Sequence, residues 1–167
     1  MPDNAALYAL SADLGKQLLA AGLRVAAAES CTGGWLAKVI TDVPGSSQWF
    51  EGGVVTYTNQ AKRELLGVAQ ATLEHQGAVS EATVGEMAAG VLAHIHADVA
   101  VAISGIAGPD GATPGKPVGM VCFAWGRAGG SVHCRTEYLS GDREAVRRQA
   151  VRIALQGLLD EFTTRFA

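Results

Sequence analysis

The chain has 167 residues, of which 49% are hydrophobic and 17% are charged, with 21 glycines and a formal net charge of -3 at pH 7. That length and composition fit a globular protein with a proper core, and we expect residues 1–167 to form one domain. No run of Lys and Arg is longer than the Arg147–Arg148 pair, which argues against nucleic acid as the main partner. No apolar stretch approaches the roughly 20 residues that a membrane helix needs, so we expect no membrane association.

The first half of the chain is predicted to alternate helices with short strands. The N-terminal residues carry early acids and have amphipathic helical spacing, which differs from a signal peptide. Gly22 is a plausible C-cap of this first helix, and Gly67 stops a later one. In chain order, the expected elements are a helix over 4–21, a strand over 23–29, a helix over 33–42, a strand over 52–58 and a helix over 59–67.

The second half is predicted to end in a hairpin and a helix. Ser80 is a candidate N-cap with Glu residues following it. DVAVAIS is a continuous apolar run, which is typical of a strand buried on both faces. In chain order, the expected elements are a helix over 80–97, a strand over 98–104, a Gly/Pro loop over 105–117, strands over 118–126 and 131–139, and a helix over 141–162. This alternation predicts an α/β sandwich with a mixed sheet.

Cysteine and histidine give no sign of a metal centre. The three cysteines, Cys31, Cys122 and Cys134, have no CxxC spacing, so we expect neither zinc nor a disulfide framework, and a reducing cytoplasm is the default. His94 and His96 lack a completing set of carboxylates beyond Asp98, so we interpret them as structural or surface residues.

Three loops follow expected strands and form the candidate site: ESCTGG, TYTNQAK and SGIAGPDG. In open α/β sheets, ligands bind beyond the carboxyl ends of the strands. In the first loop, Ser30 closes a strand, and the N–H groups that open the next helix favour an oxyanion or a phosphate. Gly33 and Gly34 would let a substrate approach the backbone. The alternatives are that Ser30 or Thr32 is only an N-cap and that Cys31 is a small buried filler.

A serine nucleophile needs a base, and the four histidines are poorly placed to supply one. Lys62 lies in the first turn of the helix after the second strand, where the helix dipole and partial burial lower the pKa of a lysine toward the neutral amine that a base requires. The alternative is a solvated lysine. Tyr57, on the same turn, either hydrogen-bonds between nucleophile and amine or packs.

The third loop and the last helix offer binding groups. Gly105, Gly108 and Gly111 allow a backbone that wraps a ligand, and Asp110 can accept a hydrogen bond from a hydroxyl. The loop matches neither GxxxxGK[ST] nor GxGxxG, so ATP and NAD are poorly supported and no cofactor is expected. Arg143 at a helix start is unfavourable for stability, which leaves an anion-binding role or a surface role.

Together these segments resemble the CinA C-terminal domain family, the PncC-type nicotinamide mononucleotide deamidases. The resemblance covers about residues 7 to 162, on the motifs AESCTGG, GGVVTYTNQAKRELLGV, GAVSE, AISGIAGPDG with PVGMV downstream, and GDREAVR. It implies a three-layer α/β/α sandwich. Many relatives carry an N-terminal domain that resembles molybdopterin-binding proteins, which this chain lacks, so it looks like a stand-alone form.

The resemblance also implies an activity and its residues. The family hydrolyses the carboxamide of nicotinamide mononucleotide to the acid and ammonia, with a serine nucleophile, a lysine and a neighbouring hydroxyl, and without metal. Ser30, Lys62 and Tyr57 match these groups. We expect a small pyridine nucleotide as substrate and a homo-oligomer as the assembly. The expected substrate-binding residues are Cys31, Thr32, Gly33, Gly34, Gly105, Ile106, Ala107, Gly108 and Arg143. The alternatives are a hydrolase of another small amide and a non-catalytic nucleotide-binding module.

Overall fold

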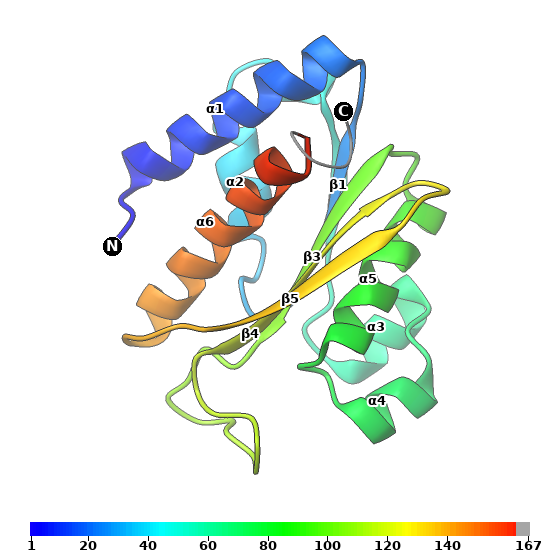
Figure 1. Ribbon diagram of the computed structural model, residues 1–167, viewed down its shortest axis with the longest axis vertical. Helices are drawn as coiled ribbons and strands as arrows, with labels where there is room; N and C mark the ends of the chain where they lie inside the picture. The colour runs from blue at the N-terminus through cyan, green and yellow to red at the C-terminus, as the bar shows by residue number, and fades with distance from the viewer. Residues whose placement is uncertain (163–167) are drawn as a thin grey trace.

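A five-stranded sheet of order β2-β1-β3-β4-β5 lies at the centre of the computed structural model, which describes residues 1–162 (Figure 1). Strand β1 is parallel to β2 and β3, whereas β4 is antiparallel to β3 and forms a hairpin with β5. The sheet is therefore mixed, as expected. The strands are β1 (Val25–Glu29), β2 (Phe50–Val55), β3 (Val99–Gly105), β4 (Met120–Arg127) and β5 (Val132–Tyr138).

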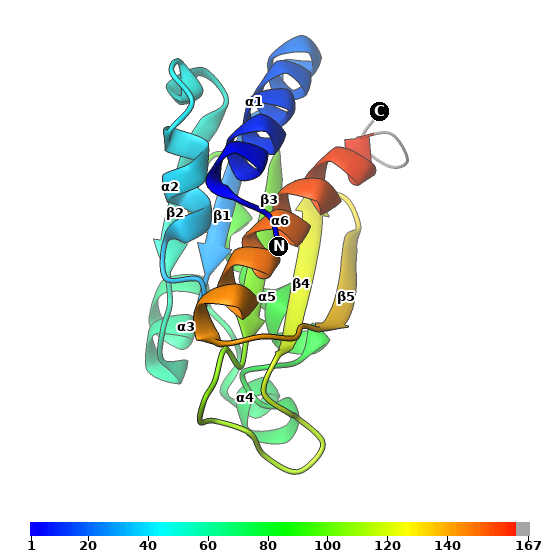
Figure 2. The ribbon, with the colours of Figure 1, turned by 90° about the vertical axis from the view of Figure 1, so that its left-hand side faces the viewer.

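Helices cover both faces of the sheet, which makes the three-layer α/β/α sandwich (Figure 2). One face carries α1 (Asn4–Ala21), α2 (Trp35–Thr41) and α6 (Arg143–Glu161). The other carries α3 (Asn59–Leu66), α4 (Gln70–Gln76) and α5 (Glu81–His94). A short 3-10 helix, Ser46–Gln48, precedes β2. The expected fold class is confirmed.

The apolar pattern of β1 explains why the sheet is buried on both faces. Val25 and Ala27 belong to the core under α1, α2 and α6, whereas Ala26 and Ala28 belong to the core under α3 to α5. Successive side chains of a strand point to opposite faces, so this all-apolar strand supplies both cores. β3 shows the same burial along its apolar residues.

Two elements, β2 and α4, depart most clearly from the sequence predictions, and most of the others differ by one to three residues at an end. β2 begins at Phe50 and ends at Val55, so Thr56 to Thr58 form a connection and not strand. The helix α4 over residues 70–76 was not predicted; it has no side-chain N-cap, and Leu73 is its only buried residue. The expected caps are present: Gly22 ends α1, Gly67 ends α3, and Ser80 caps α5.

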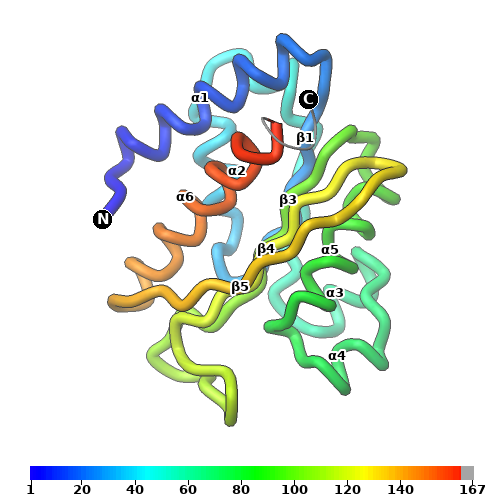
Figure 3. The backbone as a smooth tube through the Cα atoms, in the orientation of Figure 1, coloured from blue at the N-terminus to red at the C-terminus, as the bar shows by residue number. Residues whose placement is uncertain are grey.

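The carboxyl ends of β1, β2 and β3 meet at one edge of the sheet because these three strands are parallel. The loops after them therefore gather at that edge, and the long connection between β3 and β4 projects beyond it (Figure 3). The N-terminal end of α6 reaches the same edge (Figure 2). This arrangement brings segments that are more than 100 residues apart in the chain to one site.

Candidate active site

A cavity of about 230 Å³ lies at this edge of the sheet. All three predicted loops and the start of α6 contribute to it. Its lining consists of Ser30, Cys31, Tyr57, Asn59, Lys62, Ala78, Val79, Ser104, Gly105, Ile106, Ala107, Gly108, Asp110, Gly111 and Arg143. The structure thus brings together nine of the twelve residues that we expected at the site.

The Ser30 hydroxyl and the Lys62 amine are in direct contact inside this cavity. Lys62 Nζ lies 2.9 Å from Ser30 Oγ and donates a second hydrogen bond of 2.8 Å to the carbonyl of Thr56. Lys62 is only 1% exposed and Ser30 only 7%. Ser30 directly follows β1, and Lys62 lies in the first turn of α3, whose N-cap is Thr58. The edge of the sheet therefore presents a hydroxyl and an amine to each other.

Burial lowers the pKa of Lys62 from about 10.5 to about 8, because the charged ammonium loses its water. Within residues 1–162, no carboxylate forms an ion pair with this amine that would stabilise the charge. A pKa of about 8 leaves roughly one tenth of the amine neutral at pH 7. In that form, the amine still donates to the Thr56 carbonyl, and its lone pair can accept the Ser30 hydroxyl proton across the same 2.9 Å contact.

The two residues that follow Ser30, Cys31 and Thr32, are not in a nucleophilic state. Burial raises the pKa of the Cys31 thiol to about 12, and the nearby Glu29 carboxylate adds to this effect. The thiolate is the reactive form of cysteine, so Cys31 is inert at neutral pH. The Thr32 hydroxyl donates to Glu29 Oε2 at 2.6 Å and is fully buried. Of the three adjacent side chains, only Ser30 faces a base.

The N–H groups at the start of α2 are occupied by the Glu29 carboxylate. We expected Thr32, Gly33 and Gly34 to contact substrate, but none of the three lines the cavity. The Glu29 carboxylate accepts from the N–H groups of residues 34, 36 and 37. The Gly33 N–H donates to the Ser30 carbonyl. The ESCTGG loop (residues 29–34), called the bend below, therefore closes around the Glu29 carboxylate. The N–H groups at the start of α2 are not open to a ligand.

Arg143 joins two of the loops at the cavity. Its Nη1 donates to the carbonyl of Gly108 at 2.8 Å, and its Nη2 donates to the Tyr57 hydroxyl at 2.7 Å. Tyr57 is 57% exposed, and its hydroxyl forms no hydrogen bond with Ser30 or Lys62. Tyr57 therefore contacts the guanidinium rather than bridging the serine and the amine. Both acceptors of Arg143 are uncharged, so its positive charge is available to an anion.

The loop after β3 is fixed by its own backbone. The Ile106 N–H donates to the Met120 carbonyl, and the Gly119 N–H donates to the Ile106 carbonyl. Ser104, 1% exposed, donates its hydroxyl to the Ala78 carbonyl at 2.8 Å. A Cβ on Gly105 would lie 3.0 Å from the Met120 carbonyl oxygen, so this close approach to β4 favours glycine. The loop thus holds a defined wall of the cavity.

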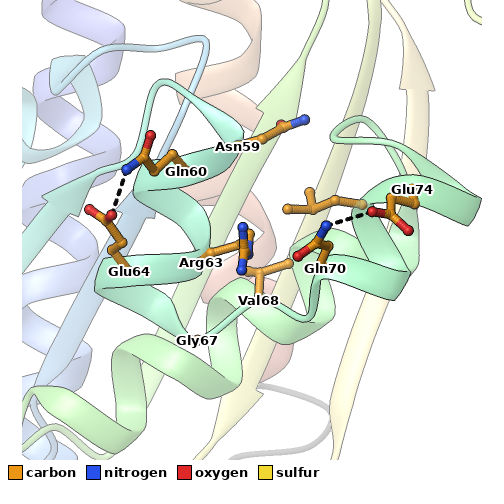
Figure 4. A pocket seen from close by; sticks show the side chains of 9 residues that line it. Asn59, Gln60, Arg63, Glu64, Gly67, Val68, Gln70 and Glu74 are labelled. Carbon is orange, nitrogen blue, oxygen red and sulfur yellow. Dashed lines mark hydrogen bonds between the residues drawn. The ribbon is translucent and has the colours of Figure 1, made fainter.

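A larger cavity of about 720 Å³ lies between α3 and α4 (Figure 4). Its wall carries two hydrogen-bonded pairs, Gln60 with Glu64 and Gln70 with Glu74. It contains no serine, cysteine or buried lysine, and it shares only Asn59 with the smaller cavity. The residues that the sequence predicts as catalytic, Ser30, Lys62 and Tyr57, line the smaller cavity instead.

The described residues contain no cluster of three or more His, Cys, Asp or Glu side chains that could hold a metal ion. His94 at the end of α5 has its Nδ1 2.8 Å from the Gly90 carbonyl, which is a contact within its own helix. Within residues 1–162, no helix is long and apolar enough to cross a membrane.

The sequence of this chain matches the model of the CinA C-terminal domain over residues 7–162. The chain belongs to the CinA C-terminal domain family. It is 57% identical over 156 residues to the nicotinamide-nucleotide amidohydrolase PncC of Escherichia coli K12, covering 93% of this chain and 94% of that protein. It is 51% identical over 150 residues to the protein of the same name from Pseudomonas putida, covering 90% and 93%.

Solved structures of CinA relatives share the fold. The crystal structure of the competence damage-inducible protein A (ComA) from Klebsiella pneumoniae superposes with a TM-score of 0.92 at 41% identity, covering 95% of this chain and 98% of that one. The competence/damage inducible protein CihA from Agrobacterium tumefaciens gives a TM-score of 0.90 at 41% identity, covering 96% of both. The fold of this chain therefore agrees with the family that its sequence shows.

Proposed function

We propose that this chain is a nicotinamide-nucleotide amidohydrolase, which hydrolyses the carboxamide of nicotinamide mononucleotide to the acid and ammonia. The observation that carries the proposal is the buried 2.9 Å contact between Ser30 Oγ and Lys62 Nζ at the cavity. A buried hydroxyl next to an amine of lowered pKa is the arrangement that an acyl-transfer reaction needs. The names of the PncC relatives, at up to 57% identity, supply the substrate.

The proposed reaction proceeds through an acyl-enzyme. Ser30 Oγ attacks the carboxamide carbon while neutral Lys62 takes the hydroxyl proton. Lys62 then gives that proton to the leaving nitrogen, the C–N bond breaks, and ammonia departs. A water molecule attacks the ester with Lys62 as base, and the C–O bond to Ser30 breaks. The products are the carboxylic acid and the restored hydroxyl, and no external oxidant or reductant is required.

Backbone N–H groups are the proposed donors to the oxyanion. The Ser30 carbonyl accepts from the Gly33 N–H, and a trans peptide directs its N–H opposite to its carbonyl. The N–H of Cys31 therefore points away from that turn, and Cys31 lines the cavity. In other serine hydrolases, the residue after the nucleophile supplies such a donor. The loop that contains Ala107 and Gly108 forms the opposite wall.

Arg143 is the proposed partner of the substrate phosphate. Its guanidinium lies at the cavity with two uncharged acceptors, a carbonyl and a phenol. A phosphate would offer it a stronger, charge-assisted partner. Tyr57 would then position the guanidinium, which differs from the catalytic role that we expected for it. This assignment predicts that the mononucleotide is preferred over free nicotinamide, which lacks the phosphate.

Ammonia release from nicotinamide mononucleotide, compared with free nicotinamide, NAD and a panel of other pyridine and pyrimidine amides, tests the proposal. Wild-type protein should release ammonia fastest from the mononucleotide, and Ser30→Ala should lose at least about 10⁴-fold in rate. Ser11→Ala is a matched control, because Ser11 is buried in α1 and does not line the cavity, and it should leave the rate unchanged.

Two results would contradict the proposal. Faster turnover of another amide would make the chain a hydrolase of that amide. Binding of the mononucleotide without ammonia release would make it a nucleotide-binding module. Near-normal activity of a folded Ser30→Ala protein would refute Ser30 as nucleophile while leaving the substrate assignment standing.

A further inference from the structure

Two charged side chains hold the bend that carries Ser30, one from each side. Glu29, at the end of β1, is 1% exposed, and its carboxylate accepts four hydrogen bonds. The donors are the Thr32 hydroxyl at 2.6 Å and the N–H groups of Gly34, Leu36 and Ala37 at 2.9 to 3.1 Å. One carboxylate thus ties the strand, the bend and the first turn of α2 together.

The second side chain comes from α6, more than 100 residues later in the chain. Arg147 Nε donates to the Cys31 carbonyl at 3.0 Å, and its Nη2 donates to the Thr32 carbonyl at 3.1 Å. Its guanidinium also lies over the Trp35 ring, 5.4 Å from the ring centroid. The planar guanidinium offers donors in a fixed fork, so this contact fixes two consecutive carbonyls at once.

These contacts divide the polar groups of the bend between the two side chains. Glu29 takes N–H groups that follow Ser30, and Arg147 takes carbonyls. The N–H groups of Cys31 and Thr32 take no part in these contacts, and of these two residues only Cys31 lines the cavity. The bend is therefore fixed on both sides, and Ser30 and Cys31 still line the cavity.

We propose that Glu29 and Arg147 are positioning residues, which clamp the bend so that Ser30 Oγ faces Lys62 and the Cys31 N–H faces the reacting carbonyl. This proposal rests on the proposed function in one respect: the reaction that Ser30 carries out is taken from it. Neither side chain lines the cavity, so both act through the backbone of the bend and not through the substrate.

A merely structural cap would not require this arrangement. A serine, threonine or aspartate at the N-cap position commonly satisfies the start of a helix. Here the N-cap position is Gly34 without a side-chain cap, and a carboxylate buried five residues earlier replaces it. Burying a charge is costly unless its partners are fixed in place. Such a buried charge specifies one geometry for the bend, which a surface cap would not.

Arg147→Met tests the clamp, with Arg148→Met as its matched control. Arg148 also lies over Trp35, at 4.8 Å, but it donates to Asn4 and Glu144 and not to the bend. Both variants thus remove a guanidinium from the same ring, and only one releases the bend. A displacement of about 1 Å at a reacting group can cost 10²-fold in rate. We expect kcat to fall about 10- to 100-fold in Arg147→Met at an unchanged KM, and to stay within twofold in Arg148→Met.

Rates are measured only on protein that is folded by circular dichroism and melts above the assay temperature. If Arg147→Met does not fold, Arg147→Lys keeps the charge but loses the planar fork that reaches both carbonyls, and it should show an intermediate kcat. Millimolar methylguanidinium should also restore part of the rate of Arg147→Ala. Equal rates in Arg147→Met and Arg148→Met, or a rise in KM at unchanged kcat, would overturn the clamp.

Glu29→Gln tests the role of the carboxylate in the clamp. Glu161→Gln is its control, because Glu161 is also buried but contacts His133 and not the bend. Glutamine replaces one acceptor with a donor that faces an N–H group. We expect the plateau of the pH–rate profile to fall at least tenfold while its acidic limb stays near pH 8, because the base itself is intact. An unchanged plateau in Glu29→Gln would refute its positioning role.

The reactivity of Ser30 toward a covalent probe tests the clamp without any substrate, and therefore independently of the proposed function. A fluorophosphonate probe should label Ser30, with Ser30→Ala as the unlabelled reference. We expect labelling to be at least tenfold slower in Arg147→Met than in Arg148→Met. If wild-type protein releases no ammonia from nicotinamide mononucleotide but shows this difference in labelling, the clamp stands and the substrate assignment fails. Equal labelling rates would refute the clamp whatever the substrate.

Discussion

Ser30, Cys31 and Thr32 are adjacent in the chain, yet their surroundings give them different chemistry. Ser30 faces the amine of Lys62, Cys31 is held as a thiol by burial, and Thr32 donates its hydroxyl to Glu29. The residue types alone leave these roles open, because each side chain is a nucleophile in some enzyme. The assignment depends on which partners the fold brings to each side chain.

The pH dependence of the rate should report Lys62. Its pKa of about 8 predicts that kcat/KM rises about tenfold per pH unit below pH 7 and levels off above pH 9, because only the neutral amine accepts the Ser30 proton. Lys62→Arg keeps the charge but has no neutral form at these pH values, so it should retain less than about one hundredth of wild-type activity.

The rate of both proteins from pH 5 to 10 provides the measurement. Lys38→Arg is the control, because Lys38 is exposed on α2 and pairs with Asp42. Retention of more than about a tenth of the activity in Lys62→Arg, a loss of under about 1.4 kcal/mol, would mean that Lys62 supplies only charge. The base would then have to be sought elsewhere.

At the scale of elements, the position of α3 determines where the amine lies. Gly90 of α5 packs against the end of α3, and a Cβ at this position would lie 1.9 Å from the Leu66 carbonyl oxygen. Because that oxygen belongs to the backbone, α3 must shift relative to α5 to make room. Lys62 lies one turn earlier on α3, so the shift would also move the amine. Gly90→Ala should therefore lower both the melting temperature and kcat.

Gly85→Ala on the same helix is the matched control for Gly90→Ala. A Cβ there meets only Cys134 Sγ at 3.5 Å, an ordinary contact. Alanine is favoured over glycine in a helix by up to about 1 kcal/mol, so this variant should be as stable as the wild type or more so. Thermal melts and ammonia release measure both variants. Equal effects of the two substitutions would contradict the packing argument.

The long periodic elements were predictable from the sequence, and the short or irregular ones were not. The sequence predicts α1 at its observed bounds, because apolar periodicity and Gly22 agree. It misses α4, whose seven residues are stabilised by Leu73 packing against the rest of the molecule. It begins β2 two residues late and ends it three residues late, because TYT has strand composition but lies beyond the last residue that pairs with β1.

The same limit applies to the candidate site. Strand-end loops point to Ser30, Lys62 and the loop after β3, since parallel strands end at one edge. The contacts of Glu29 and Arg147 were not predicted, because a local pattern does not show which polar groups meet across the fold. The one signal was their presence inside the motifs AESCTGG and GDREAVR. The expected homo-oligomer, the single domain over 1–167 and the cytoplasmic location stay predictions, and residues 163–167 lie outside the described part of the chain.

At the scale of the whole molecule, the buried amine should lower stability at neutral pH. The folded pKa of Lys62 is about 8 and the ordinary value is about 10.5, so between these values the unfolded chain binds more protons. The free energy of unfolding should therefore rise with pH across this window, by up to about 3 kcal/mol, and the full cost should be present below pH 8.

Urea unfolding of wild type and Lys62→Met at pH 7, 9 and 10.5 measures this cost. The stability of wild type relative to Lys62→Met should increase as the pH rises from 8 to 10.5, since methionine does not titrate. Lys16→Met, at an exposed position that pairs with Asp13, should show no such trend. A difference between wild type and Lys62→Met that stays constant with pH would rule out a lowered pKa in the folded state.

The place of α6 in the chain has a consequence for biosynthesis. Arg143 and Arg147 lie on the last described helix, whereas their partners come much earlier in the chain: Arg147 contacts the bend after β1, and Arg143 contacts Tyr57 and Gly108. A nascent chain on the ribosome therefore exposes Ser30 and Lys62 long before either arginine has emerged. Because domains fold as units during synthesis, the nucleophile and its base would be assembled into a competent site only after residue 147 has left the exit tunnel. Premature termination before residue 143 would yield a chain that carries both reacting groups but lacks the two arginines.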